Sequence, residues 1–433
     1  MKFITSFYYT FGTKIISLFI LLISRLLTAR ILGPADLGSI GNALNFTTIV
    51  SRWGSLGIGP ATQFTNSKYP QQRNSLLVYI ISSSVLLGIV NLIFLVNFQN
   101  EILNWQFKSD ANAQLAYLSY IPFLPLIILS MTLPVLLLGS GRIKAYSLTQ
   151  IPPLFLQTII ITALYFLPKS LYSVIWAQII YWISTIAVAF IFIDFKNFKY
   201  EFNKELFLIF ARYSLKAWPQ VILQFGIARF AVLIGSQYLS SINLGYYILA
   251  SNLSESFLVI NTSLTPLLFN RIASQGSNSN LLGISLRFSI ISLFPVFMIT
   301  YLLGKPVFIY FFGIEFAQTW NLLLLLLISV LFHSLGKICS NYLAARGKNI
   351  IVSGIQLLQI AILFTICLFA CPLFGVSGLC YASICASLTG LILYLICLQK
   401  HEKEHFKILS LFKITKDDTN IIFQILKIRT IHK

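Results

Sequence analysis

The sequence predicts an all-α membrane protein that crosses the bilayer about twelve times. Of its 433 residues, 57% are hydrophobic and only 10% are charged, and the mean hydropathy is +0.83. A soluble domain carries about 25% charged residues, so most of this chain belongs in lipid. Its apolar stretches are roughly 20 residues long, the length of a spanning helix, whereas a membrane barrel would show alternating strands of about 10.

Twelve apolar stretches follow one another along the chain, with short turns between most of them. The first is too long and too charged at its far end for a cleavable signal peptide, and it leads directly into the second. The predicted spanning helices occupy residues 13–32, 37–58, 75–98, 113–138, 148–167, 171–193, 218–238, 243–268, 281–303, 316–338, 350–371 and 375–398.

The basic residues predict how these helices are oriented. If the N-terminus is cytoplasmic and the chain crosses twelve times, the inner segments hold 21 Lys and Arg residues, and the outer loops hold only Lys108, Lys169 and Lys305. Cytoplasmic loops of membrane proteins carry such an excess. Both termini are therefore expected in the cytoplasm. The net charge of +19 then reflects topology, and we expect no nucleic-acid partner.

The sequence carries no pattern for a metal, redox or nucleotide site. The six cysteines fall in or beside the last three spans without a CxxC pair, which is typical of small apolar core residues. The four histidines do not form an HExxH motif, and no P-loop occurs. We therefore expect no cofactor and no metal.

A weak internal repeat divides the chain into two halves. The segment ADLGSIGNAL (35–44) is similar to INLGYYILAS (242–251), 207 residues later, and each begins a new span. The basic turns at 137–150 and 343–356 are separated by nearly the same offset. Six-span repeats are typical of transporters built from two lobes. We expect an N-terminal six-helix lobe (1–200), a C-terminal six-helix lobe (201–398), a basic boundary loop (194–217) and a basic tail (399–433).

Several motifs occur in the order and spacing of one known family. They are ARILGPADLG (29–38), the seventh and eighth spans (218–257), the segment from FFGIEF to AARGK (311–348) and PLFGVSGLCYAS (372–383). In these residues the chain resembles the Wzx-type polysaccharide flippases. That family belongs to the multidrug, oligosaccharidyl-lipid and polysaccharide (MOP) exporter superfamily.

The resemblance implies a two-lobed, V-shaped bundle like that of the MATE and other MOP exporters. It also implies a non-enzymatic function in the bacterial inner membrane. The implied function is translocation of undecaprenyl-pyrophosphate-linked oligosaccharide units for O-antigen, capsule or exopolysaccharide synthesis. The implied partners are this lipid-linked glycan, membrane lipids, and a polysaccharide polymerase with its chain-length regulator. The implied driving force is coupling to H+ or Na+.

Four charged residues lie within predicted spans, where charge is costly and marks a cavity or a partner. They are Arg25 in the first span, Arg52 in the second, Arg229 in the seventh and Glu255 in the eighth. Because arginine matches phosphate geometry with paired donors, a cationic cavity for the pyrophosphate is one interpretation. Related flippases of lipid-linked cell-wall precursors carry cavity arginines on their first two spans, and Arg25 and Arg52 resemble them in placement.

Other interpretations of the polar residues remain open. Arg52 lies near the end of its helix, so its side chain could instead reach the membrane surface. For Arg30, Arg287 and Lys337, reaching the membrane surface is the interpretation that we favour. Arg229 and Glu255 either pair with each other across neighbouring helices, or Glu255 binds the coupling ion. Five residues are candidates for sugar contacts or for contacts between helices: Asn42, Asn45, Gln224, Tyr246 and Tyr247.

Three rival functions belong to other classes. A cation-coupled drug exporter of the same superfamily would be favoured by an acidic residue deep in the first span, which has none. A polysaccharide polymerase or ligase needs a large outer loop, and the longest here, about 99–112, is short. A scaffold without transport is the third, although the buried arginines disfavour it. The basic tail is either an amphipathic helix on the inner membrane surface or disordered.

Overall fold

The computed structural model describes residues 2–166, 171–193, 202–258, 279–346 and 348–401. Helices make up most of these segments, and no strand occurs within them. The predicted all-α class is therefore confirmed. The two interpretations of the basic tail concern residues that lie beyond the described part of the chain.

The N-terminal half combines long helices with several short ones. In chain order they are α1 (Lys2–Gly54), α2 (Ile58–Lys68), α3 (Arg73–Asn97), α4 (Gln99–Ile102), α5 (Ala111–Tyr120), α6 (Leu124–Thr132), α7 (Val135–Gly139), α8 (Ile143–Leu148), α9 (Ile151–Tyr165) and α10 (Leu171–Phe192).

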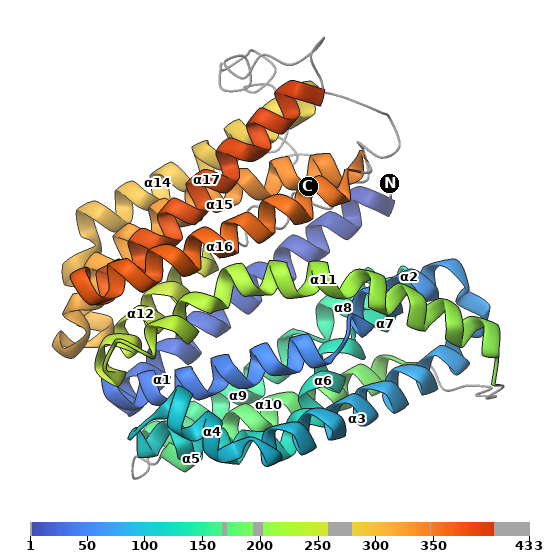
Figure 1. Cartoon of the computed structure of the whole chain (residues 1–433), viewed down its shortest axis with the longest axis horizontal. Helices are drawn as coiled ribbons and strands as arrows, with labels where there is room; N and C mark the ends of the chain where they lie inside the picture. Colours follow the sequence, from blue (N-terminus) through green and yellow to red (C-terminus); the bar gives the residue numbers. More distant parts are fainter. Residues whose placement is uncertain (1, 167–170, 194–201, 259–278, 347, 402–433) are drawn as a thin grey trace, which may run out of the picture.

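The C-terminal half consists of longer and more regular helices. They are α11 (Lys204–Gly235), α12 (Ser241–Ser256), α14 (Ser279–Phe312), α15 (Ala317–Ala345), α16 (Asn349–Phe374) and α17 (Val376–His401). In Figure 1 the start of α1 and the end of α17 lie toward the same end of the molecule, as an even number of crossings requires.

The helix α1 contains both of the first two predicted spans. Its backbone leaves the helical region at Gly33, where φ is 68° and ψ is 177°, and Pro34 follows directly. Glycine adopts positive φ at little cost, and proline cannot donate a backbone hydrogen bond. The chain therefore changes direction here, and Figure 1 shows the two blue parts of α1 running in different directions.

The helix α11 corrects one prediction. We expected a basic loop over 194–217, but the chain is helical from Lys204 onward. Asn203 begins this helix by accepting a hydrogen bond from the Leu206 backbone N–H at 3.0 Å. Ser214 then donates to the Leu56 carbonyl oxygen at 2.6 Å, which holds the early turns of α11 against the end of α1. The basic side chains in this segment indicated a loop, because neither the cap at Asn203 nor the contact of Ser214 with Leu56 can be recognised from charge.

Four buried apolar clusters hold the helices together. Two lie mainly among α1–α10 and two mainly among α11–α17. The division is not sharp, because Ala29 of α1 belongs to a C-terminal cluster and Leu206 of α11 to an N-terminal one. Figure 1 shows α14–α17 on one side and α3–α10 on the other, with α1, α11 and α12 between. A boundary of two lobes near residue 200 stays a prediction.

Within the described segments, nine helices are long and apolar enough to cross a membrane, or ten if the bent α11 is counted. The first, Gly12–Gly54, has 43 residues, roughly 65 Å at 1.5 Å per residue, which suffices for two crossings. The predicted eighth span is helical as far as Ser256 in α12, and its continuation over 259–268 lies outside the described residues. The chain is a multi-pass membrane protein, whereas the count of twelve and the cytoplasmic termini stay predictions.

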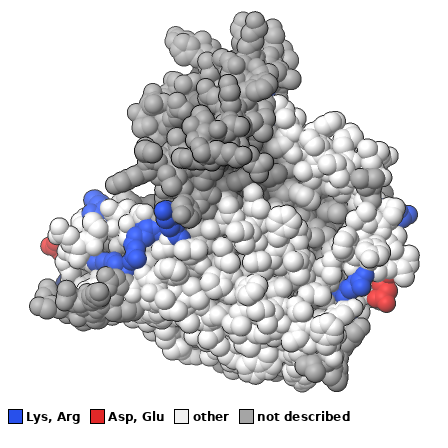
Figure 2. Space-filling model, turned by 180° about the vertical axis from the view of Figure 1, so that it is seen from behind, with Lys and Arg blue, Asp and Glu red and all other residues white. Residues whose placement is uncertain are grey.

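The outer surface is suited to lipid. Large apolar side chains point outward from several helices, and Phe19, Ile191 and Phe369 are each more than half exposed. On the face shown in Figure 2, Lys, Arg, Asp and Glu lie toward the two ends, and the broad middle is free of them. Such an uncharged band flanked by charged ends is what a bilayer requires.

Candidate functional site

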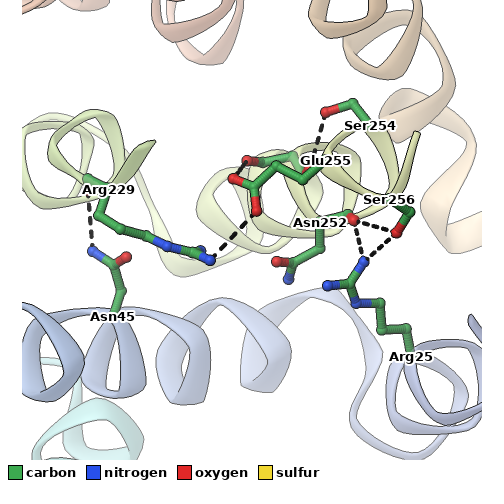
Figure 3. A network of polar contacts seen from close by, with 8 residues as sticks. Arg25, Asn45, Arg229, Asn252, Ser254, Glu255 and Ser256 are labelled. Atoms are coloured by element: carbon green, nitrogen blue, oxygen red, sulfur yellow. Dashed lines mark hydrogen bonds and ion pairs between the residues drawn. The ribbon is translucent and has the colours of Figure 1, made fainter. Parts of the chain in front are cut away.

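The first part of α1 is tied to α12 by Arg25. Its Nη1 donates to the Asn252 carbonyl oxygen and to Ser256 Oγ, the latter at 2.7 Å. Ser256 Oγ itself donates to the same carbonyl at 2.9 Å, so the three groups form a closed triangle (Figure 3). Arg25 is half-buried and lies eight residues before the Gly33 turn, roughly 12 Å along the helix. It therefore bridges the two halves of the chain.

The same end of α12 also receives an arginine from α11. Arg229 Nη2 lies 3.4 Å from Glu255 Oε2, and Glu255 Oε1 accepts from Ser251 Oγ at 3.4 Å. These two side chains remain about 30% exposed. The structure therefore shows the pair across adjacent helices, one of the two alternatives for these residues, while ion binding by Glu255 stays a prediction. Asn45 of α1 donates from Nδ2 to the Arg229 carbonyl oxygen at 3.2 Å, which brings a third helix to the same place (Figure 3).

Arg52 differs from the other two arginines in how its donors are used. Its guanidinium lies over the Phe225 ring, 5.7 Å from the centroid. The side chain makes no hydrogen bond to any described residue, and its buried Nε has no partner there. A cation over an aromatic face is stabilised without using its N–H donors. Arg52 is thus held in place by Phe225 while its donors remain available.

Arg229 connects the three arginines. It lies close enough to both Arg25 and Arg52 for their charges to repel, while Glu255 pairs with Arg229 and also lies near Arg25. This arginine region lies where α1, α11 and α12 meet. Its charge is net positive, and several kcal/mol are needed to keep unpaired charges in a membrane interior. An anion bound there would reduce that cost.

A separate cavity lies within the C-terminal half. We call it the C-half cavity; its volume is about 330 Å³, and it is lined by α11, α12, α15, α16 and α17. Three predicted site residues reach it: Gln224, Tyr247 and Glu255. Tyr247 is 3% exposed, and its hydroxyl lies 3.3 Å from Ser383 Oγ. Glu255 is the residue that both the arginine region and the C-half cavity share.

Two predicted sugar contacts lie elsewhere. Asn42 is 4% exposed and accepts from Gln106 Nε2 at 2.9 Å, so it belongs to a buried network between α1 and the helical turn Leu103–Phe107 before α5. Tyr246 packs edge-on against Phe316, with 6.2 Å between ring centroids. The structure therefore groups Arg25, Asn45, Arg52, Arg229 and Glu255, and it separates Asn42 and Tyr246 from them.

The structure also reveals a clamp that the sequence analysis did not identify. Asp110 Oδ1 accepts from the Ala113 N–H at 2.9 Å and so caps α5. Its Oδ2 accepts from Ser39 Oγ of α1 at 2.7 Å and from Ser241 Oγ of α12. We call Asp110, Ser39 and Ser241 the outer clamp, since they lie at the predicted outer end. The sequence can indicate that an aspartate at this position caps a helix. It does not indicate the partners of that aspartate, which lie 71 and 131 residues away.

The other charged residues within the spans have mixed outcomes. Arg30 is exposed and donates to the Tyr310 and Phe311 carbonyl oxygens at the end of α14, where a cation also meets the negative end of the helix dipole. Arg287 is only 6% exposed, and Lys337 lines the C-half cavity. The prediction that these last two reach the membrane surface was wrong. A helix that is apolar all round does not show in its sequence which face packs inward.

Cysteine and metal chemistry add nothing to the site. Four cysteines are buried in the apolar C-terminal core or beside it: Cys339, Cys367, Cys371 and Cys380. No group of three metal-ligating side chains occurs in the part of the chain that the structure describes.

A family model places the chain among known proteins. The model described as "Polysaccharide biosynthesis protein" matches residues 27–321. The chain belongs to this family. The match covers α1 from just after Arg25 to the start of α15, and it agrees with the resemblance to polysaccharide flippases. No curated protein sequence matches the chain.

Solved structures of MOP-superfamily transporters share its fold. A MATE family multidrug resistance transporter in an inward-facing conformation has a TM-score of 0.72 at 13% identity, covering 90% of this chain and 96% of that one. The lipid II flippase MurJ, in an inward closed conformation, has 0.71 at 18% identity, covering 98% and 92%. The eukaryotic MATE transporter AtDTX14 has 0.67 at 17% identity, covering 91% and 95%.

These similarities establish the MATE/MOP fold that was predicted. They cover nearly the whole chain, although identities below 20% carry fold information only. An outward-facing MATE transporter scores lower, at 0.60.

Proposed function

We propose that this protein is a flippase that moves undecaprenyl-pyrophosphate-linked oligosaccharides across the bacterial inner membrane by alternating access. Its family works in polysaccharide biosynthesis, and its fold is shared with a flippase of a lipid-linked cell-wall precursor. The observation that carries the proposal is that Arg229 lies near both Arg25 and Arg52 between the two halves, with Glu255 as the carboxylate paired to it. A pyrophosphate supplies the missing negative charge.

The contacts suggest an order of engagement for the arginines. Arg52 has unused donors and lies 19 residues after the Gly33 turn, roughly 28 Å along the helix and so near the cytoplasmic end. It is the first phosphate ligand. Arg25 lies deeper, and its Nη1 must release the end of α12 before the whole guanidinium can turn to a phosphate. Substrate binding is thereby linked to a change at the interface between the halves.

Glu255 is the candidate for coupling to H+ or Na+. It is the only acidic residue that we place deep in a predicted span, and Arg229 holds one of its oxygens. An incoming phosphate that draws Arg229 away would free the carboxylate for a cation. Binding of cargo and of the driving ion would then reinforce each other.

The closed outer clamp supports an inward-facing resting state. Ser39 and Ser241 from the two halves meet on Asp110 at the predicted outer end. The higher similarity to an inward-facing relative than to an outward-facing one points the same way. The glycan head group then enters from the cytoplasm, while the lipid tail remains in the bilayer and the halves rock about the site. A polymerase and its chain-length regulator would receive the unit outside.

Complementation tests this proposal. The protein is expressed in a bacterium lacking its own polysaccharide flippase, and surface glycan is stained, with Arg52→Ala and Arg25→Ala alongside. Exposed Arg212 of α11, replaced by alanine, is the matched control. We expect the wild type and the control to restore glycan, and the two site variants to restore less than about a tenth at equal membrane levels, since a charged hydrogen bond contributes roughly 1.5–3 kcal/mol. Restoration by all four proteins would refute the arginine site.

Drug export is the second candidate, because multidrug transporters share this fold. The same strains are therefore grown with cationic dyes. Dye resistance that depends on Glu255, together with no glycan in hosts of several repeat-unit types, would replace the flippase proposal with this one.

A further inference from the structure

The C-half cavity is built apart from the arginine region. Its lining comes from α11, α12 and the three last helices, and no residue of α1–α10 contributes among those described. At about 330 Å³, it lies at the lower end of the range for small-molecule pockets, roughly 300–1,000 Å³. It therefore has room for one small molecule, such as a single sugar, rather than for a lipid or a whole repeat unit.

The positive charge of this cavity comes from Lys337. His333 lies one turn before it on α15, both residues line the cavity, and neither side chain makes a hydrogen bond or ion pair with another described residue. The one carboxylate in the lining, Glu255, is already bonded to Arg229. Lys14 of α1 lies near enough to Lys337 to add repulsion. An anion, not a cation, is what these groups would bind.

Two buried polar groups in the cavity lining indicate that its ligand also carries hydroxyl groups. Gln356 is 8% exposed, and its Oε1 accepts no hydrogen bond from any described residue. The Nδ2 of Asn341, one turn beyond Lys337, is also buried without a described partner. Both residues line the cavity. Because unpaired buried polar groups are costly, a ligand that donates to Gln356 and accepts from Asn341 would be favoured. A hydroxyl can do both.

We infer that the C-half cavity binds a sugar carrying a carboxylate or a phosphate. Lys337 and His333 bind the oxyanion, while Gln356 and Asn341 bind ring hydroxyls. The binding of an acidic sugar is inferred from the cavity itself. Only the statement that this sugar is an acidic unit of the transported glycan rests on the proposed function. The two basic regions divide the cargo, with the pyrophosphate at the arginines of the interface and the acidic sugar inside the C-terminal half.

Binding is tested directly on the purified full-length protein in detergent. Saturation-transfer NMR, which detects weak ligands, is run with glucuronate, glucose 1-phosphate and neutral glucose, and phosphorus relaxation is run with inorganic phosphate. The variants are Lys337→Gln, the charge-conserving Lys337→Arg, and Lys305→Gln as a control. Lys305 is an exposed lysine of α14 that does not line the cavity. Elution as a single species shows that each variant is folded.

We expect the wild type to bind glucuronate or glucose 1-phosphate at least about tenfold more tightly than glucose, since oxyanion contacts are the strong ones. Lys337→Gln should lose this preference, and Lys337→Arg and Lys305→Gln should keep it. Equal binding of glucose and the charged sugars would overturn the inference. So would a folded Lys337→Gln protein that binds like the wild type. Inorganic phosphate binding as tightly as glucose 1-phosphate would overturn the sugar assignment.

The inference and the proposed function can fail separately. If complementation fails in every host while the binding pattern holds, the sugar site stands and only its role in glycan transport falls. If complementation succeeds but no charged sugar binds, the flippase stands and the C-half cavity is not its sugar site.

Discussion

The crossing of α1 and α12 at Gly38 and Gly245 offers the sharpest test of how the two halves meet. A Cβ built on Gly38 would lie 1.8 Å from the Ser241 carbonyl oxygen and 2.8 Å from the Gly245 backbone nitrogen. A Cβ on Gly245 would lie 1.9 Å from the Pro34 carbonyl oxygen. Backbone meets backbone on both sides, so no flexible side chain can move aside. The perturbation is Gly38→Ala.

The size of the effect follows from these distances. Ordinary contact for a Cβ begins at 3.4 Å, so the helices must separate locally by about 1.5 Å. Overpacking of this kind costs roughly 1–3 kcal/mol. The cost falls on the conformation with a closed outer end, because the helices part when that end opens. The population of the open conformation should therefore rise roughly 5- to 150-fold.

The assay measures access from outside. Ser39 is 3% exposed beside this crossing, so a Ser39→Cys reporter is labelled with a membrane-impermeant maleimide in intact cells. Labelling should be several-fold faster in the Gly38→Ala background, and glycan restoration should fall. Gly354→Ala in α16 is the control, since nothing lies within 4 Å of its built Cβ. Unchanged labelling and transport in Gly38→Ala at a normal membrane level would refute the reasoning.

Three further predictions concern single contacts. The Ser39→Cys reporter removes one hydroxyl of the outer clamp, and Asp110→Asn then weakens the remaining charged hydrogen bond from Ser241. Reporter labelling should therefore rise by about tenfold or less; slower labelling would contradict this. Arg229→Ala leaves the Glu255 carboxylate without its ion-pair partner, so thermal unfolding should begin at a lower temperature. The double variant Arg229→Ala/Glu255→Ala should recover part of this loss of stability. A double variant less stable than both single variants would refute the pairing. Arg30→Ala removes the cap of α14 and should cost roughly 0.5–1 kcal/mol of stability, measured as a small fall in melting temperature; an unchanged melting temperature would show that the cap is not stabilising.

Helix class and the approximate position of most spans could be predicted because they depend on local physics. A stretch of about 20 apolar residues must form a helix in lipid, and the Gly33–Pro34 turn is visible as a dipeptide. The start of α11 could not be predicted, because its first turns are held by Asn203 and by the Leu56 carbonyl. Such packing is a property of the folded chain.

The candidate site was predicted in part for the same reason. Arg25, Arg52 and Arg229 were identified because charge in a span is rare and costly, and the structure brings them together. The sequence does not show which donors are already used: Arg25 and Arg229 each bond through one nitrogen, whereas the Arg52 side chain makes no hydrogen bond to a described residue. Lys337 was misassigned to the membrane surface, since facing direction is set by packing of α15 against its neighbours.

The internal repeat acquires a physical meaning from the helix crossing. The offset of 207 residues relates Gly38 to Gly245 and Pro34 to Ser241. In the structure Gly38 faces the carbonyl oxygen of Ser241, which lies four residues before Gly245. Gly245 in turn faces the carbonyl oxygen of Pro34, which lies four residues before Gly38. The two copies of the repeat therefore pack on each other about an approximate two-fold axis. A motif that begins a span in each half is then a point where the backbones of the two halves approach closely. Since a rocking motion needs a contact that closes in one conformation and parts in the other, the repeated glycine is where we expect that contact, and the outer clamp beside it is expected to hold it closed.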